Sequence, residues 1–281
     1  MTRYALNPAM PVLSRPDGVI QIGWDPRRAL LVRPPAGMSV GTLGALLRVL
    51  HCGATHVQLA DVADGVDETT IADLIAELLD AGVVTALPPA RTRSASIRIH
   101  GRGPLSDLLA GALRCSGVRI KTSNQLHAGV RPEKTDLVVL SDSLVADPRM
   151  LRDLHEARTP HLAVRVRDGA GLVGPLVVPG VTSCLRCADL HRSDRDANWP
   201  AVAVQLRDAV GNADRATVLG TAAVALNQVD RVIAAVRGGV GVDRAPHPPS
   251  TLDTTLEFDV ATGSTTARRW TRHPRCTLCS G

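Results

Sequence analysis

The sequence predicts an α/β protein in which a small winged-helix-like α+β module precedes a larger domain with a doubly wound parallel sheet and a structural zinc site. Three observations predict this arrangement. Apolar runs of strand length alternate with amphipathic helical segments from residue 97 onward, a strand hairpin and helices precede them, and two Cys-x-x-Cys pairs stand in the second half of the chain. The 281 residues have the length of about two domains.

The winged-helix-like module is expected at residues 1–90. Its apolar runs flank a turn, and its helical segments carry apolar residues at helical spacing between a capping residue and a glycine. In chain order the expected elements are a hairpin of residues 18–24 and 29–33, a helix that begins after Ser39, a helix over 67–81 and a short strand at 83–87.

The second domain is expected at residues 91–281. A Pro-rich stretch without periodicity, residues 88–96, marks the boundary. Alternating strands and helices predict a parallel sheet covered on both faces. The expected strands are 97–100, 118–120, 137–140 and 162–166, the expected helices are 105–113, 148–157 and 213–236, and a closing hairpin is formed by 254–260 and 265–270.

Composition excludes several classes of function. The net charge is +5, but 30 of the 32 basic residues are arginines and aromatic residues make up only 2% of the chain, so a base-stacking nucleic-acid surface is not expected. The predicted helix at 67–81 is acidic and would repel phosphates. No run of about 20 uninterrupted apolar residues predicts a membrane span, and we expect a soluble, cytoplasmic protein without membrane partners.

The two cysteine pairs predict a metal site. Cys184 and Cys187 form the first pair, Cys276 and Cys279 form the second, and 88 residues separate the two pairs. Four thiolates close a tetrahedral zinc site and leave no position for a catalytic water. We therefore expect one structural Zn²⁺, with a redox dithiol as the alternative. Cys52 and Cys115 are expected to be small core residues, and His273 to be a supporting donor, a reserve ligand or an exposed side chain.

A glycine turn gives a weaker indication of a cofactor. Gly101 and Gly103 stand between a predicted strand and a predicted helix, where a nucleotide-binding fold would hold phosphates. The third glycine of the motif is replaced by Ser106, and Pro104 lacks a backbone N–H. The turn is thus expected to be a degenerate nucleotide loop, and ATP is not expected to bind.

Three stretches together carry a resemblance to a known family: residues 173–187, 218–229 and 268–279, which include both cysteine pairs. They resemble the ThiF/MoeB, ubiquitin-activating-type adenylating fold, and are most similar to its divergent branch among cyclodehydratase partner proteins of thiazole/oxazole-modified microcin biosynthesis. The resemblance implies a truncated Rossmann-like ThiF-type domain with a zinc site, a homodimer, and an N-terminal peptide clamp that recognises a leader peptide.

The sequence also departs from this family. About 15 residues separate Ile120 from Asp136, where adenylating members carry an acidic strand end, an Arg-Gln stretch and a lysine, and residues 188–275 contain no cysteine that could form a thioester. The resemblance therefore implies the fold and the zinc site without the ATP and magnesium machinery. An enzyme is not expected, and no catalytic residue is assigned.

The leading hypothesis is a non-catalytic scaffold that binds the leader of a precursor peptide and presents it to a separate modifying enzyme. The peptide would add as a strand to the edge of the hairpin at 19–32, with the helix at 67–81 as the other wall. The alternatives are an ATP-dependent adenylating enzyme of the ThiF type and a winged-helix DNA-binding regulator. The residues expected to contact the peptide are Val19, Ile20, Ile22, Leu31, Val32, Leu74 and Leu78.

Overall fold

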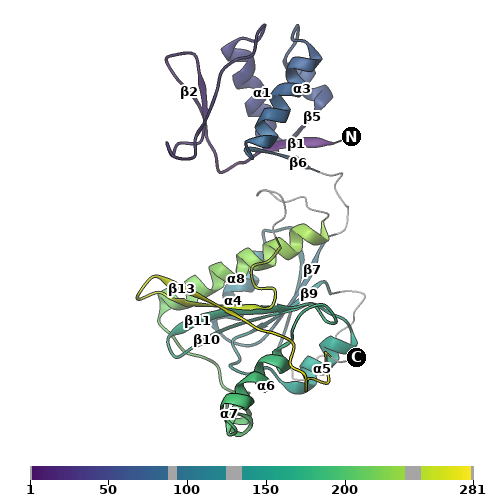
Figure 1. Ribbon diagram of the computed structural model, residues 1–281, viewed down its shortest axis with the longest axis vertical. Helices are drawn as coiled ribbons and strands as arrows, with labels where there is room; N and C mark the ends of the chain where they lie inside the picture. The colour runs from purple at the N-terminus through teal and green to yellow at the C-terminus, as the bar shows by residue number, and fades with distance from the viewer. Residues whose placement is uncertain (1, 88–93, 125–134, 238–247, 280–281) are drawn as a thin grey trace. The chain divides into compact units, whose positions relative to one another are not determined.

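The computed structural model describes residues 2–87, 94–124, 135–237 and 248–279 (Figure 1). The described residues form two compact units, one of residues up to 87 and one of residues 94–236 and 248–279. Each unit has its own hydrophobic core.

The first unit contains two three-stranded antiparallel sheets, with strand orders β5-β1-β6 and β2-β3-β4. The predicted hairpin is confirmed, because Ile20 pairs with Val32 and Ile22 with Leu30. The sequence analysis did not predict the strands before it. The strands are β1 (Arg3–Leu6), β2 (Val12–Ser14), β3 (Ile20–Ile22), β4 (Leu30–Val32), β5 (Ala54–Thr55) and β6 (Val84–Leu87).

Three capped helices complete this unit: α1 (Val40–Cys52), α2 (His56–Val62) and α3 (Glu68–Asp80). The Ser39 hydroxyl accepts the backbone N–H of Thr42, and the Asp67 carboxylate accepts that of Thr69, which satisfies amides that the first helical turn leaves free. The apolar stripes of α1 and α3 lie in the core, as their spacing predicts. A capping box of Thr55 and Gln58 begins α2, in the segment of residues 55–65 where the resemblance would place the middle helix of a peptide clamp.

The second unit is built on a seven-stranded mixed sheet of order β13-β12-β11-β10-β9-β7-β8. The four strands β8, β7, β9 and β10 are parallel, and β11, β12 and β13 continue antiparallel. The four strands predicted for the parallel sheet are thus confirmed as parallel, but the whole sheet is mixed, because β11 forms a hairpin with β10 and the predicted closing hairpin of β12 and β13 adds antiparallel to β11. The strands are β7 (Ser96–His100), β8 (Arg119–Ser123), β9 (Leu137–Ser141), β10 (His161–Arg167), β11 (Ala170–Val177), β12 (Thr254–Asp259) and β13 (Ser264–Arg269).

Helices cover both faces of this sheet (Figure 1). One core lies between the sheet and α4 (Pro104–Leu113) with α8 (Arg215–Val236); the other lies under α5 (Pro148–Glu156) and α6 (Leu185–Arg195). A short helix, α7 (Trp199–Leu206), follows α6 and buries none of its residues. Among the described residues α8 is the one helix long and apolar enough for a membrane span, and it packs against α4, β10 and β11 as a core helix.

Candidate metal centre and the closed glycine turn

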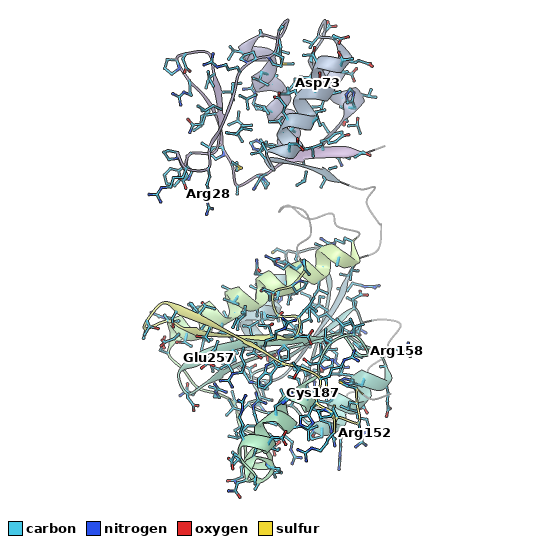
Figure 2. The ribbon with its side chains drawn as sticks, in the orientation of Figure 1. Arg28, Asp73, Arg152, Arg158, Cys187 and Glu257 are labelled. Carbon is cyan, nitrogen blue, oxygen red and sulfur yellow. The ribbon has the colours of Figure 1, made fainter. Side chains whose placement is uncertain are left out.

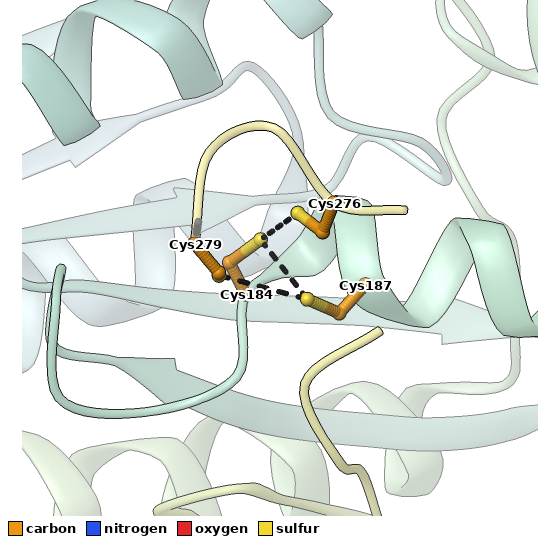
Figure 3. A group of neighbouring side chains, drawn as sticks. All are labelled: Cys184, Cys187, Cys276 and Cys279. Carbon is orange, nitrogen blue, oxygen red and sulfur yellow. Dashed lines mark hydrogen bonds between the residues drawn. The ribbon is translucent and has the colours of Figure 1, made fainter. Parts of the chain in front are cut away.

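The four cysteines of the two Cys-x-x-Cys pairs come together at one end of α6 (Figure 3). Cys184 is the residue before α6, Cys187 lies in its first turn, and Cys276 and Cys279 belong to the C-terminal turn. Sulfur to sulfur distances are 3.7 Å for Cys184 to Cys187, 3.6 Å for Cys184 to Cys276 and 3.6 Å for Cys187 to Cys279. Zinc bound by four sulfurs at ~2.3 Å would set them about 3.8 Å apart, whereas a disulfide needs ~2 Å.

The electrostatics of the cluster also suit a cation. The hydrogen bond from the Cys184 thiol lowers the pKa of Cys187 to about 4, and the same contact raises the pKa of Cys184. Burial raises the pKa of Cys279 to about 12. One thiolate thus forms readily at Cys187 while Cys184 and Cys279 retain their protons, since several negative charges cannot accumulate in this buried place without a compensating cation. The Cys184, Cys187, Cys276 and Cys279 cluster could therefore hold a metal ion such as zinc.

His273 supports this turn. The side chain is only 4% exposed, so the expectation that it is exposed is wrong. Its Nδ1 accepts the backbone N–H of Arg275 at 3.1 Å, and its Nε2 donates to the Asp194 carboxylate at 2.8 Å. Both ring nitrogens are therefore in use, and Asp194 also pairs with the guanidinium of Arg275. These bonds connect α6 to the turn that carries Cys276.

The two remaining cysteines do not pack in a core. Cys52 at the end of α1 and Cys115 after α4 are both exposed, so the expectation of buried core residues is wrong. Cys52 is the last residue of α1, and Cys115 lies two residues after the end of α4, where the apolar stripe of each helix has ended. They provide exposed comparison thiols for experiments on the cluster.

The glycine turn is closed by a side chain from a neighbouring strand. Asp142 directly follows β9, is 2% exposed, and accepts the backbone N–H of Leu105 at 3.0 Å and that of Ser106 at 3.0 Å. The Ser106 hydroxyl donates to the same carboxylate. A Cβ at Gly103 would lie 2.7 Å from an Asp142 oxygen, and one at Gly101 would overlap the Ser141 carbonyl oxygen. Both glycines therefore allow the close approach of β9.

These contacts use the amide groups that a phosphate would need. Pro104 has no N–H, Leu105 and Ser106 donate to Asp142, and the N–H of Asp107 donates to the Gly103 carbonyl. Phosphates bind helix N-termini through free amides. In the described part of the chain the first turn of α4 offers no such free donor, so the residues present do not fit a phosphate group at this position.

A cavity of about 730 Å³ lies beside this turn. It is bounded by the carboxyl ends of β7 and β8 and by one side of α4. Ser123 at its wall is held by the Arg98 side chain at 2.8 Å and by His100 at 3.0 Å. Its charged lining consists of Arg102, Asp107 and Arg114.

The residues expected to contact a peptide are mostly buried. Val19, Ile20, Ile22, Val32, Leu74 and Leu78 lie in the interior of the first unit. The strand β3 pairs with β2 on one side and with β4 on the other, so Ile22 does not lie at a sheet edge, and the expectation that a peptide could pair there is wrong. Among the described residues, β4 is the strand of this hairpin that lies at the edge of its sheet, and Leu31 on it is 54% exposed.

Comparison with solved structures shows the same fold elsewhere. The heterocyclase TruD superposes with a TM-score of 0.66 at 17% identity, over 99% of this chain and 43% of that one. A heterocyclase in complex with substrate and cofactor superposes with a TM-score of 0.67 at 16% identity, over 99% of this chain and 40% of that one. E. coli MccB with AMPCPP and MccA superposes with a TM-score of 0.60 at 12% identity, over 99% of this chain and 100% of that one.

At these low identities the likeness shows a shared mixed α/β fold. This chain spans about two fifths of the length of the heterocyclase chains, and nearly all of MccB. No protein-family model and no curated protein sequence matches it.

Proposed function

We propose that this protein is a non-catalytic, zinc-stapled scaffold that binds the leader of a precursor peptide and presents it to a separate modifying enzyme. The observation that carries the proposal is the closed first turn of α4, because its amides already bind the Asp142 carboxylate and cannot also bind the phosphates of ATP. The proposal places the protein in the cytoplasm, as a homodimer, with zinc as its metal.

The first unit supports the peptide-binding part of the proposal. An extended peptide can add to the β4 edge through main-chain hydrogen bonds, in the manner expected of a winged-helix-like clamp. Leu31 on this edge and Trp24 before it are 54% and 75% exposed, so apolar side chains are available to a ligand. The neighbouring structures include a heterocyclase with substrate and MccB with N-formylated MccA.

Charge on the first unit indicates what such a leader contains. Arg27, Arg28 and Arg33 flank β4, are exposed, and take part in no side-chain ion pair within the described residues. The helix α3 carries acidic residues instead, and Figure 2 places Arg28 and Asp73 on opposite sides of the unit. A leader with acidic residues beside an apolar one would complement the β4 edge.

An adenylating enzyme is the second candidate. The cavity of about 730 Å³ beside Gly101 and Gly103 favours it, because the resemblance would place a nucleotide there. A DNA-binding regulator has less support, since the acidic α3 would face the phosphates.

Two measurements on the full-length protein separate these functions. Exchange of labelled pyrophosphate into ATP, with and without candidate peptides, should stay at background for a scaffold, and robust exchange would establish the enzyme. Titration with precursor peptides encoded next to this gene should give micromolar or tighter binding to the leader half only. Equal binding of leader and core halves, or none, would contradict the scaffold.

A further inference from the structure

The cavity beside the glycine turn has no role in the proposed scaffold. Its volume of about 730 Å³ lies within the range of roughly 300 to 1,000 Å³ of pockets that bind small molecules. It opens outside the carboxyl ends of β7 and β8, the edge at which α/β sheets bind their ligands. Ile99 and Ser106 are the buried part of its lining, at 1% and 7% exposed. The cavity therefore has the size and the place of a ligand site.

Hydrogen bonds within the protein already engage two hydroxyls in the wall of this cavity. The Ser106 hydroxyl donates to the Asp142 carboxylate, and the Ser123 hydroxyl accepts the Arg98 guanidinium at 2.8 Å. The first amides of α4 are engaged by Asp142 as well. Charged and polar side chains nearer the solvent are therefore left to select the ligand.

One stripe of α4 forms a wall with opposite charges at its two ends. Asp107, Ala110, Gly111 and Arg114 follow one another at helical spacing and share one face. At 1.5 Å per residue, Asp107 and Arg114 lie about 10 Å apart along the helix axis. A Cβ at Gly111 would meet no atom within 4 Å, so the middle of the wall is open. A ligand along this wall meets a carboxylate, then small residues, then a guanidinium.

The charged groups of this cavity are available to a ligand. Arg102, Asp107 and Arg114 form no side-chain hydrogen bond or ion pair with another described residue. Asp107 would repel a phosphate at the glycine turn and attract an ammonium group, and the planar guanidinium of Arg114 matches the two oxygens of a carboxylate. Two arginines and one aspartate give this lining one net positive charge. The complementary ligand thus has opposite charges at its ends and one net negative charge.

The carboxyl end of β8 supplies polar groups on the other wall. Thr122 and Asn124 are exposed there, and their side chains form no hydrogen bond with another described residue. An amide side chain offers both a donor and an acceptor, as a peptide group does. This wall therefore suits a peptide backbone better than a purely apolar body.

We propose that this cavity binds a short acidic peptide of about three residues with free termini, its ammonium group at Asp107 and its carboxylate at Arg114. Three extended residues span about 10 Å, which matches the separation of these two charges along α4. An acidic side chain on the first residue of the peptide would pair with Arg102 and supply the net negative charge. The site does not depend on the proposed function, which places the leader on the first unit.

The test uses the zinc-loaded full-length protein and the tripeptide Glu-Ala-Ala with free termini, at constant ionic strength. Ligand-observed NMR should show saturable binding by the wild type. Gly111→Leu fills the open middle of the wall and should abolish binding without lowering the melting temperature, because leucine favours the helix more than glycine does. Arg152→Met removes an exposed arginine of α5 and should leave binding unchanged (Figure 2).

Blocked peptides assign the two ends of the site. N-acetylation removes the ammonium group and should weaken binding to the wild type severalfold, whereas Asp107→Asn should bind the free and the acetylated peptide alike. Amidation of the carboxylate should also weaken binding to the wild type, and Arg114→Met should not distinguish the amidated from the free peptide. This pairing of each chemical block with one variant is a response that a general loss of structure would not give.

Several results would overturn the proposal. Among them are no saturable binding of the tripeptide, equal binding by the wild type and Gly111→Leu, and a doubly blocked peptide that binds the wild type as tightly as the free one. ATP is the competing probe. Saturable ATP binding that Gly111→Leu abolishes, without binding of the tripeptide, would assign the cavity to a nucleotide instead.

Discussion

The carboxylate of Asp142 accepts the backbone N–H of Ser106 at 3.0 Å, although the two residues are 36 positions apart in the chain. The parallel pairing of β7 with β9 brings them together, since β7 leads into α4 and Asp142 directly follows β9. A helix N-terminus that could bind a phosphate is in this way capped by the protein itself.

This cap should matter more for stability than an exposed one. Asp142→Ala leaves two buried amides without an acceptor, and we expect it to lower the free energy of unfolding by about 2 to 3 kcal/mol. Asp147→Ala removes the exposed cap of α5, a 2.7 Å bond from the Arg149 N–H, and should cost about 1 kcal/mol. Urea unfolding followed by circular dichroism compares them; equal losses would contradict a special role for Asp142.

The cysteine cluster should hold about one zinc per chain. Cys276→Ser removes one of four thiolates, so metal content measured by elemental analysis should fall well below one, and the melting temperature should drop because metal binding is coupled to folding. Cys115→Ser is the matched control, since this thiol is exposed and distant in sequence from the cluster. Full zinc retention by Cys276→Ser would rule out a four-thiolate site.

Acid should destabilise the second unit partly through His161. Burial lowers the pKa of this histidine to about 4; its Nδ1 bonds the Thr159 carbonyl, and its Nε2 has no partner within the described residues. The unfolded chain takes up a proton near pH 6.5 while the folded chain does not, so stability falls as pH decreases from about 6.5 to about 4, by up to about 3 kcal/mol.

His161→Gln should remove most of this dependence, because glutamine does not titrate. Unfolding free energies of the wild type and the variant, measured at several pH values between 4 and 7, give the difference in slope. Metal release at low pH affects both proteins equally and cancels in the comparison. Identical slopes would show that His161 does not contribute.

Local patterns located α1 and α3 and the four cysteines that the structure brings together. Ser39, Asp67 and the apolar spacing after them act within one or two turns, so α1 and α3 could be located from sequence. Each Cys-x-x-Cys turn likewise presents two sulfurs through local geometry. The second cysteine pair follows the hairpin of β12 and β13 in the chain, so this hairpin brings it to the first pair. The sequence also predicted this hairpin.

Features that depend on distant partners could not be predicted. The apolar runs of β10 and β11 look alike whether their partner is parallel or antiparallel, so the mixed sheet was not foreseen. Asp142 stands in a polar Ser-Asp-Ser stretch, and nothing in that stretch signals a bond to α4. Arg165 alternates with valines, which indicates a strand but not which face is buried.

Leader binding should depend on the β4 edge and on its basic flank. Leu31→Glu puts a negative charge on the exposed face of β4, and we expect it to weaken binding of an acidic leader to the full-length protein at least tenfold. Val57→Glu is the matched control on α2, since Val57 is 52% exposed in the same unit. Calorimetric titration of both variants compares them under identical conditions.

Salt provides an independent check on the same interaction. Raising the ionic strength from about 0.1 M to about 1 M shortens the screening length from about 10 Å to about 3 Å, so attraction between the leader and Arg27, Arg28 and Arg33 should fade. Arg28→Gln should reduce this salt dependence without changing the fold, because the side chain is exposed. Main-chain pairing along β4 does not depend on salt in this way. A leader that binds Leu31→Glu as tightly as Val57→Glu, with the same salt dependence, would therefore place the binding site away from β4.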